Sequence, residues 1–163
     1  MNNNINDIYS YDRAKTVLEP YVKAAFEELG YIVRNATDKE DMELHSDLYI
    51  VGKNNIYKKP YGIDVKGNSK NIRFSDKLTF TKISKTGKAF IPNIENFFAF
   101  VDERTCEIYI INQVKFFRIT KNFNLIKSNK NNSQYIWVEK QFLRDNASRI
   151  IKPSSKINLM LNK

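Results

Sequence analysis

The feature that most constrains the fold is one amphipathic segment followed by several short apolar runs. Residues 11–29 carry apolar side chains at helical spacing, which predicts one helix with a single buried stripe. The apolar runs after it are short and separated by polar turns, as β-strands are. We expect strands at 31–35, 47–51, 61–66, 97–101, 107–111 and 135–139, and short helices at 113–119 and 140–146. This order predicts an α/β domain around a mixed β-sheet of about five strands flanked by helices.

The remaining segments are polar and show little periodicity. We expect a long basic loop over residues 68–93, a polar loop over 121–133, a loose polar N-terminus and a loose basic tail over 152–163. The polar stretch 52–59 is expected to form the turn of a hairpin between the second and third strands. Pro20 predicts a kink or restart within the helix, and Gly30 stands where a helix C-terminal glycine belongs. No internal repeat or linker divides the chain, so one domain over residues 1–163 is expected.

Composition excludes several classes of protein. Cys106 is the only cysteine and His45 the only histidine, which argues against a disulfide framework, a cysteine zinc cluster and a Ser-His-Asp triad. No run of about 18 apolar residues predicts a membrane span. The Asn-rich N-terminus lacks the apolar core of a signal peptide, so a cytoplasmic protein of a bacterium or of a phage-infected cell is expected.

The net charge of +9 is concentrated in one segment. Residues 53–88 hold ten basic residues against Asp64 and Asp76, whereas residues 1–52 are acidic overall. Dense positive charge attracts polyanions through counterion release, although charge alone fits a lysine-rich solubilising surface equally well. The candidate nucleic-acid-binding residues are Lys53, Lys58, Lys59, Lys70, Arg73, Lys77, Lys82, Lys85 and Lys88.

A charged pair interrupts the apolar third strand. Side chains alternate along a strand, so Asp64 and Lys66 lie on one face, roughly 6.6 Å apart. Asp47 begins the paired strand and is expected near Asp64 across the hairpin. Two converging carboxylates repel unless a cation lies between them, and oxygen ligands favour Mg²⁺ or Mn²⁺. A lysine beside such an ion can orient a water molecule for attack on a phosphodiester.

This arrangement resembles the PD-(D/E)XK nuclease superfamily, which includes restriction endonucleases and archaeal Holliday-junction resolvases. The resemblance covers about residues 12–111 and implies a restriction-endonuclease-like core. It implies that Asp47, Asp64 and the Val65 carbonyl hold the metal ion, and that Lys66 is the catalytic lysine. It also implies a helix carboxylate, for which Glu19 fits best because it lies eleven positions before the Gly30–Tyr31 pair. The other acidic residues near this helix are Asp12, Glu27 and Glu28.

The resemblance implies a metal-dependent DNA endonuclease that leaves a 5′ phosphate. A structure-selective enzyme acting on branched or junction DNA is one form of it, and cutting both strands would require a homodimer. The family's proline before the first aspartate is Ser46 here, and the 17-residue separation of the two aspartates is long. His45 and Asp41 are candidate accessory residues. An inactive nucleic-acid-binding or protein-interaction module of the same fold and an RNase are the alternatives.

Two other expectations concern side chains outside this constellation. Cys106 has no nearby base in the sequence and is expected to be inert. Trp137 is expected in the core, together with Phe97, Phe98, Phe100, Phe116 and Phe117.

Overall fold

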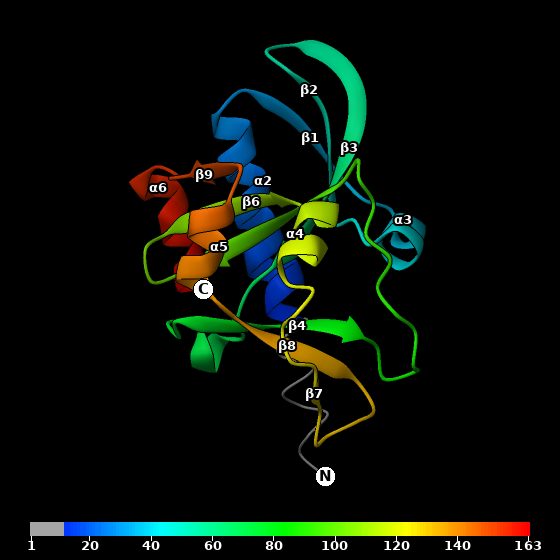
Figure 1. The fold of residues 1–163 in the computed structure, drawn as a ribbon. Helices are drawn as coiled ribbons and strands as arrows, with labels where there is room; N and C mark the ends of the chain where they lie inside the picture. Colours follow the sequence, from blue (N-terminus) through cyan, green and yellow to red (C-terminus); the bar gives the residue numbers. More distant parts are fainter. Residues whose placement is uncertain (1–11) are drawn as a thin grey trace.

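A six-stranded mixed sheet forms the centre of the computed structural model, which describes residues 12–163 (Figure 1). Its strand order is β1-β2-β3-β5-β6-β9, with β3 and β5 parallel and the other neighbours antiparallel. These strands are β1 (Tyr31–Asn35), β2 (Leu48–Lys53), β3 (Ile56–Lys66), β5 (Phe97–Asp102), β6 (Glu107–Asn112) and β9 (Arg149–Ile151). The predicted α/β class with a mixed sheet is confirmed.

The β2–β3 hairpin is longer than the sequence predicted. Its strands continue to Lys53 and from Ile56, so the predicted turn over 52–59 is wrong. Asn54 and Asn55 both have positive φ, 52° and 65°, as a tight two-residue hairpin turn requires. Figure 1 shows the hairpin curving away from the rest of the sheet.

The long helix consists of η1 (Ala14–Leu18), a π-helical turn, and α2 (Glu19–Glu28). The N–H of Glu19 donates to the carbonyl of Ala14, five residues back. Pro20 has no N–H and cannot donate the next helical hydrogen bond. The kink or restart predicted at this residue is a π-helical turn that ends just before it. Gly30 ends the helix with φ +90°, a conformation that favours glycine.

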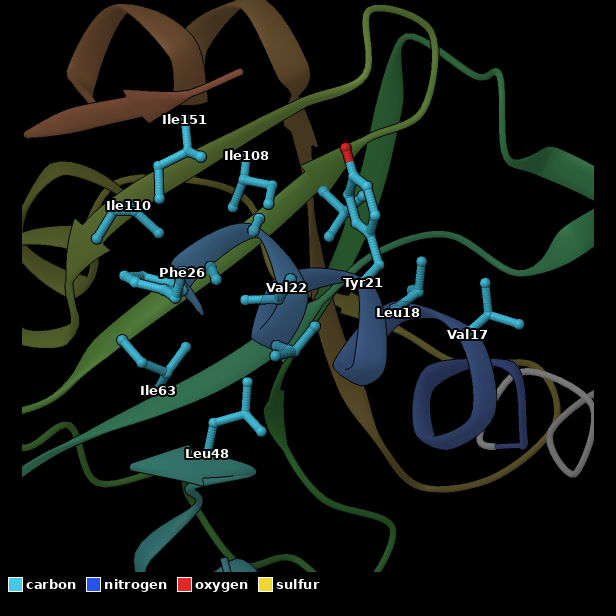
Figure 2. Close-up of a cluster of buried hydrophobic side chains, with 14 of the residues drawn as sticks. Val17, Leu18, Tyr21, Val22, Phe26, Leu48, Ile63, Ile108, Ile110 and Ile151 are labelled. Carbon is cyan, nitrogen blue, oxygen red and sulfur yellow. The ribbon is translucent and has the colours of Figure 1, made fainter. Parts of the chain in front are cut away.

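One face of this helix packs on the large sheet. Leu18, Val22 and Phe26 are nearly inaccessible and lie over Ile63 and other apolar residues of the sheet (Figure 2). The approach is close where η1 meets the end of β3. A Cβ atom on Gly67 would lie 2.6 Å from Leu18 Cδ1, so glycine permits the contact. The helix is therefore held against the strand that carries Asp64 and Lys66.

A second sheet, which the sequence did not predict, packs on the face of the large sheet opposite the long helix. Its order is β4-β8-β7, formed by β4 (Lys77–Ile83), β7 (Ile126–Lys127) and β8 (Gln134–Glu139). The predicted loops over 68–93 and 121–133 therefore contain strands, together with the short η2 (Lys70–Ile72). Phe80 of β4 packs on Phe98 and Phe116, with ring centroids 5.1 and 4.7 Å away. Trp137 is 45% exposed on the outer face of β8, so its predicted place in the core is wrong.

Short helices complete the described chain. They are α3 (Asp38–Leu44), α4 (Gln113–Ile119), α5 (Lys140–Asn146), α6 (Ser155–Asn158) and η3 (Leu159–Asn162). The tail predicted to be loose is folded, because Leu161 is buried and its carbonyl accepts bonds from Arg13 and Arg73. The loose N-terminus was predicted for residues outside the described part. Within residues 12–163, no helix combines the length and hydropathy that crossing a membrane requires.

Candidate active site

The β2–β3 hairpin brings Asp47 and Asp64 together. Leu48 is paired with Ile63, and the N–H of Asp47 donates to the Ile63 carbonyl at 2.8 Å. The Val65 N–H donates to Asp47 Oδ2 at 2.7 Å, which fixes the carboxylate against β3. The Asp47 carboxylate is close enough to Asp64 to add to the rise in pKa that burial gives that side chain, so the two carboxyl groups lie near each other. Such proximity is what a shared cation would require.

Glu19 reaches the same point from the helix. It lies at the junction of η1 and α2, its side chain is 13% exposed, and it is hydrogen-bonded to Asp47. The other helix acids point elsewhere: Glu27 is exposed, and Glu28 accepts a bond from the Ser154 N–H at 2.9 Å. Of the predicted helix carboxylates, the structure places Glu19 in the cluster.

Lys66 follows Asp64 on the same face of β3, as strand alternation predicted. Its Nζ lies 3.2 Å from Asp64 Oδ1 and 5.7 Å from the centroid of the Phe80 ring. The Lys66 side chain is 35% exposed. The second sheet thus forms one wall beside the lysine.

Lys15 also belongs to the cluster, although no sequence motif singled it out. Its Nζ lies 3.0 Å from Glu19 Oε1, 2.8 Å from Asp41 Oδ2 and 3.6 Å from Asp47 Oδ1. The i,i+4 spacing of Lys15 and Glu19 on one helix was a readable signal for the first contact. The contacts with Asp41 and Asp47 depend on the fold.

Crowding of the carboxylates raises two of their pKa values. Burial, then the hydrogen bond and charge of Asp47, raise the pKa of Glu19 to about 8. Burial is also the main reason why the pKa of Asp64 rises to about 7, with Lys66 opposing and Asp47 adding to the rise. Burial works to raise the pKa of Asp47 too, but hydrogen bonds from Glu19 and the Val65 N–H leave it lowered.

These directions describe a cluster that retains protons near neutral pH. Compared with ordinary carboxyl groups, Glu19 and Asp64 favour the protonated form, and Asp47 favours the ionised form. Burial lowers the pKa of Lys66, but the carboxylates of Asp64 and Asp47 outweigh this and raise it, so the lysine is charged. A divalent cation can replace the retained protons, because it compensates the same negative charges.

The two accessory candidates lie at the rim. Asp41 of α3 binds Lys15. His45 ends α3 in the left-handed conformation, with φ 49°, and its ring stacks on Phe90 with centroids 4.3 Å apart. Burial first, and then the charges of Lys66 and Lys88, lower the pKa of His45, which favours the neutral imidazole.

The basic residues predicted to bind nucleic acid divide into two groups. Arg73 and Lys82 are used within the fold, because Arg73 Nη1 donates to the Leu161 carbonyl and Lys82 Nζ to the Thr120 carbonyl, each at 3.2 Å. Contact of these two residues with nucleic acid stays a prediction. Lys53, Lys58 and Lys59 instead line an open pocket of about 330 Å³ together with residues of β1, β2 and β3, and Lys59 also pairs with the exposed Glu95 at 2.8 Å. The other exposed members are Lys70, Lys77, Lys85 and Lys88.

The oxygen donors suit a hard divalent ion that keeps part of its water shell. Mg²⁺ needs only one or two protein carboxylates, with water and phosphate oxygens completing six positions. Asp47 and Asp64 supply that number. Among residues 12–163, no three His, Cys, Asp or Glu side chains are arranged as a ready metal cage.

Comparisons of the chain with protein-family models, with curated proteins and with solved structures gave no match. The function is therefore argued from the residues and geometry of this cluster. The cluster joins Glu19 of the helix, Asp47 just before β2, and Asp64 and Lys66 of β3, with Lys15 and Asp41 in contact at its edge.

Proposed function

We propose that the protein is a divalent-metal-dependent nuclease that hydrolyses DNA phosphodiester bonds. The observation that carries the proposal is the convergence of Glu19, Asp47, Asp64 and Lys66 at one point. Three structural elements that are distant in sequence supply them, and their order and element types match the PD-(D/E)XK pattern. An Asp-x-Lys tripeptide that occurred by chance would not be expected to lie beside one acidic residue at the neighbouring strand and a second one on a helix.

Each side chain has a role that follows from its contacts. Asp47 and Asp64 would hold Mg²⁺ or Mn²⁺, together with the Val65 carbonyl that the resemblance implies. When bound, the ion supplies Lewis-acid polarisation and a lowered pKa for its water ligand. The Lys66 ammonium group lies beside the Asp64 carboxylate, where it would donate a hydrogen bond to the attacking water and orient it. Glu19 holds Asp47 in place from the helix and can take up a proton.

The basic hairpin supports a polyanionic substrate. Lys58 lies six positions before Asp64 along β3, so Lys58 and Lys59 are at most about 20 Å from Asp64 along the strand. That distance is within the length of a short duplex lying along the hairpin. Lysines there would contact backbone phosphates and would confer affinity without base recognition. We further propose that cleavage of both strands requires a homodimer, because one chain provides one such cluster among its described residues.

The test compares two aspartates of the same basic segment. Wild type, Asp64→Asn and Asp76→Asn are incubated with plasmid and branched DNA in Mg²⁺, Mn²⁺ or EDTA. We expect metal-dependent nicking by wild type and by Asp76→Asn, whose side chain is exposed, and loss of at least about 100-fold in Asp64→Asn. Unchanged DNA binding with no nicking by wild type on any substrate would favour a binding module instead. Cleavage of single-stranded RNA alone would identify an RNase.

A further inference from the structure

Lys15 places a positive charge among carboxylates from three parts of the chain. Glu19 lies on α2, Asp41 on α3 and Asp47 at the start of β2, and each has an oxygen within 3.6 Å of the ammonium nitrogen. The Lys15 side chain is 32% exposed. The lysine is thus the point at which these three elements meet, and it approaches Asp47 at Oδ1, whereas the Val65 N–H donates to Oδ2.

The net charge of the cluster equals in size, and is opposite in sign to, the charge of one divalent cation. Within residues 12–163, the cluster's four carboxylates, those of Glu19, Asp41, Asp47 and Asp64, and its two ammonium groups, those of Lys15 and Lys66, have a net charge of −2 when all are ionised. One Mg²⁺ or Mn²⁺ neutralises that charge. Without Lys15 the net charge is −3, and one divalent ion no longer neutralises the cluster.

Distances also distinguish the two cation positions. Oxygens at 2.8 to 3.6 Å suit a lysine ammonium, whereas Mg²⁺ requires about 2.0–2.1 Å. In two-metal nucleases the second ion lies about 3.5–4 Å from the first. Asp47 borders both positions here, because one of its oxygens faces Lys15 and its side chain also contacts Asp64.

We propose that Lys15 takes the place of a second cation, so that the site loads one divalent ion, between Asp47 and Asp64, rather than two. This inference rests on the proposed metal-dependent function. Lys15 is a positioning residue: it holds Glu19 and Asp47 by charge, and it does not exchange with solvent ions. Its removal opens a second ion position among Glu19, Asp41 and Asp47, whose oxygens then close inward by about 0.7 to 1.5 Å to reach the Mg²⁺ distance.

The experiment counts bound ions without DNA. Mn²⁺ is titrated into wild type, Lys15→Met, Lys15→Arg and Lys23→Met at pH 8, with free ion measured by electron paramagnetic resonance and heat by calorimetry. We expect one ion in wild type and two in Lys15→Met. Lys15→Arg keeps a cation and should bind one. Lys23→Met removes a positive charge from the same helix away from the carboxylates, and it should also bind one.

The outcomes separate the inference from the function on which it rests. Two ions in wild type, or one ion of unchanged affinity in Lys15→Met, would overturn the role of Lys15 and leave the nuclease proposal standing. No ion in wild type or in any variant would overturn the metal-dependent function and the inference with it. Circular dichroism shows whether each variant is folded, and Lys15→Gln replaces Lys15→Met if the latter is not.

Discussion

Replacing Glu19 by Gln should stabilise the metal-free protein, and increasingly so as the pH rises. The folded protein holds the Glu19 proton up to a pKa of about 8, whereas an unfolded glutamate releases it near 4.5. Between these values the folded state binds more protons than the unfolded state, so this group's contribution to stability is lost as the pH rises. Gln is neutral throughout, and its amide can still donate to Asp47.

The size of the effect follows from the shift in pKa. Each pKa unit corresponds to about 1.4 kcal/mol, so the full shift is worth about 5 kcal/mol at pH 9. The measured gain will be smaller, because Asp47 shares the proton and Gln loses the ion pair with Lys15. We expect Glu19→Gln to match wild type at pH 5 and to exceed it by about 2 kcal/mol at pH 9.

The assay is urea unfolding in EDTA at intervals from pH 5 to 9, followed by circular dichroism. Glu27→Gln, an exposed acid on the same helix, is the matched control and should differ from wild type by a constant amount at every pH. A difference between Glu19→Gln and wild type that stays constant or shrinks with rising pH would refute the idea of a proton-retaining cluster. Adding Mg²⁺ should reduce the pH dependence of wild type, since the ion displaces the protons.

Three further predictions concern Lys66, the hairpin lysines and Arg73. Lys66→Met should lower single-turnover cleavage by about 100-fold or more while DNA affinity changes little, because orienting a proton-transferring water contributes rate rather than binding; an equal loss of affinity would assign Lys66 to DNA binding. Replacing Lys58 and Lys59 together by Ala should reduce the slope of log affinity against log salt by up to about 2. Arg73→Ala should leave that slope unchanged and lower the unfolding midpoint, since Arg73 bonds Leu161; a reduced slope in Arg73→Ala would reverse that assignment.

Elements with a strong local pattern were predictable from the sequence. The α4 helix has the predicted bounds, and β1 does too. Period-two alternation along β3 is enough to place Asp64 and Lys66 on one face, because it depends only on neighbouring residues of one strand. The spacing from Gly30–Tyr31 selected Glu19 from the helix acids, and the fold brings that residue to Asp47.

What the sequence did not predict depends mostly on contacts between distant residues. In β4, Leu78 and Phe80 alternate with polar residues, but the strand pairs with β8, more than 50 residues later. The Leu161 carbonyl accepts a hydrogen bond from Arg13, 148 positions away. Lys15 could be paired with Glu19 from spacing, but not with Asp41 or Asp47.

The α3 helix is a different case, because its signal is local. Thr37 and Glu40 form a capping box, which is a sequence pattern for a helix N-terminus. The helix is only seven residues long and none of its residues is buried, so it has no apolar stripe to predict it by periodicity.

The most direct test of the central claim is the metal dependence of DNA cleavage by the unaltered protein. End-labelled duplex, branched and single-stranded DNA are incubated with the full chain in Mg²⁺, in Mn²⁺ and in EDTA, and the new ends are analysed. We predict cleavage with either ion, none in EDTA, and products that carry a 5′ phosphate. Cleavage that persists in EDTA, or none with either ion while the DNA remains bound, would contradict the assignment of Asp47, Asp64 and Lys66 as a metal-dependent nuclease site.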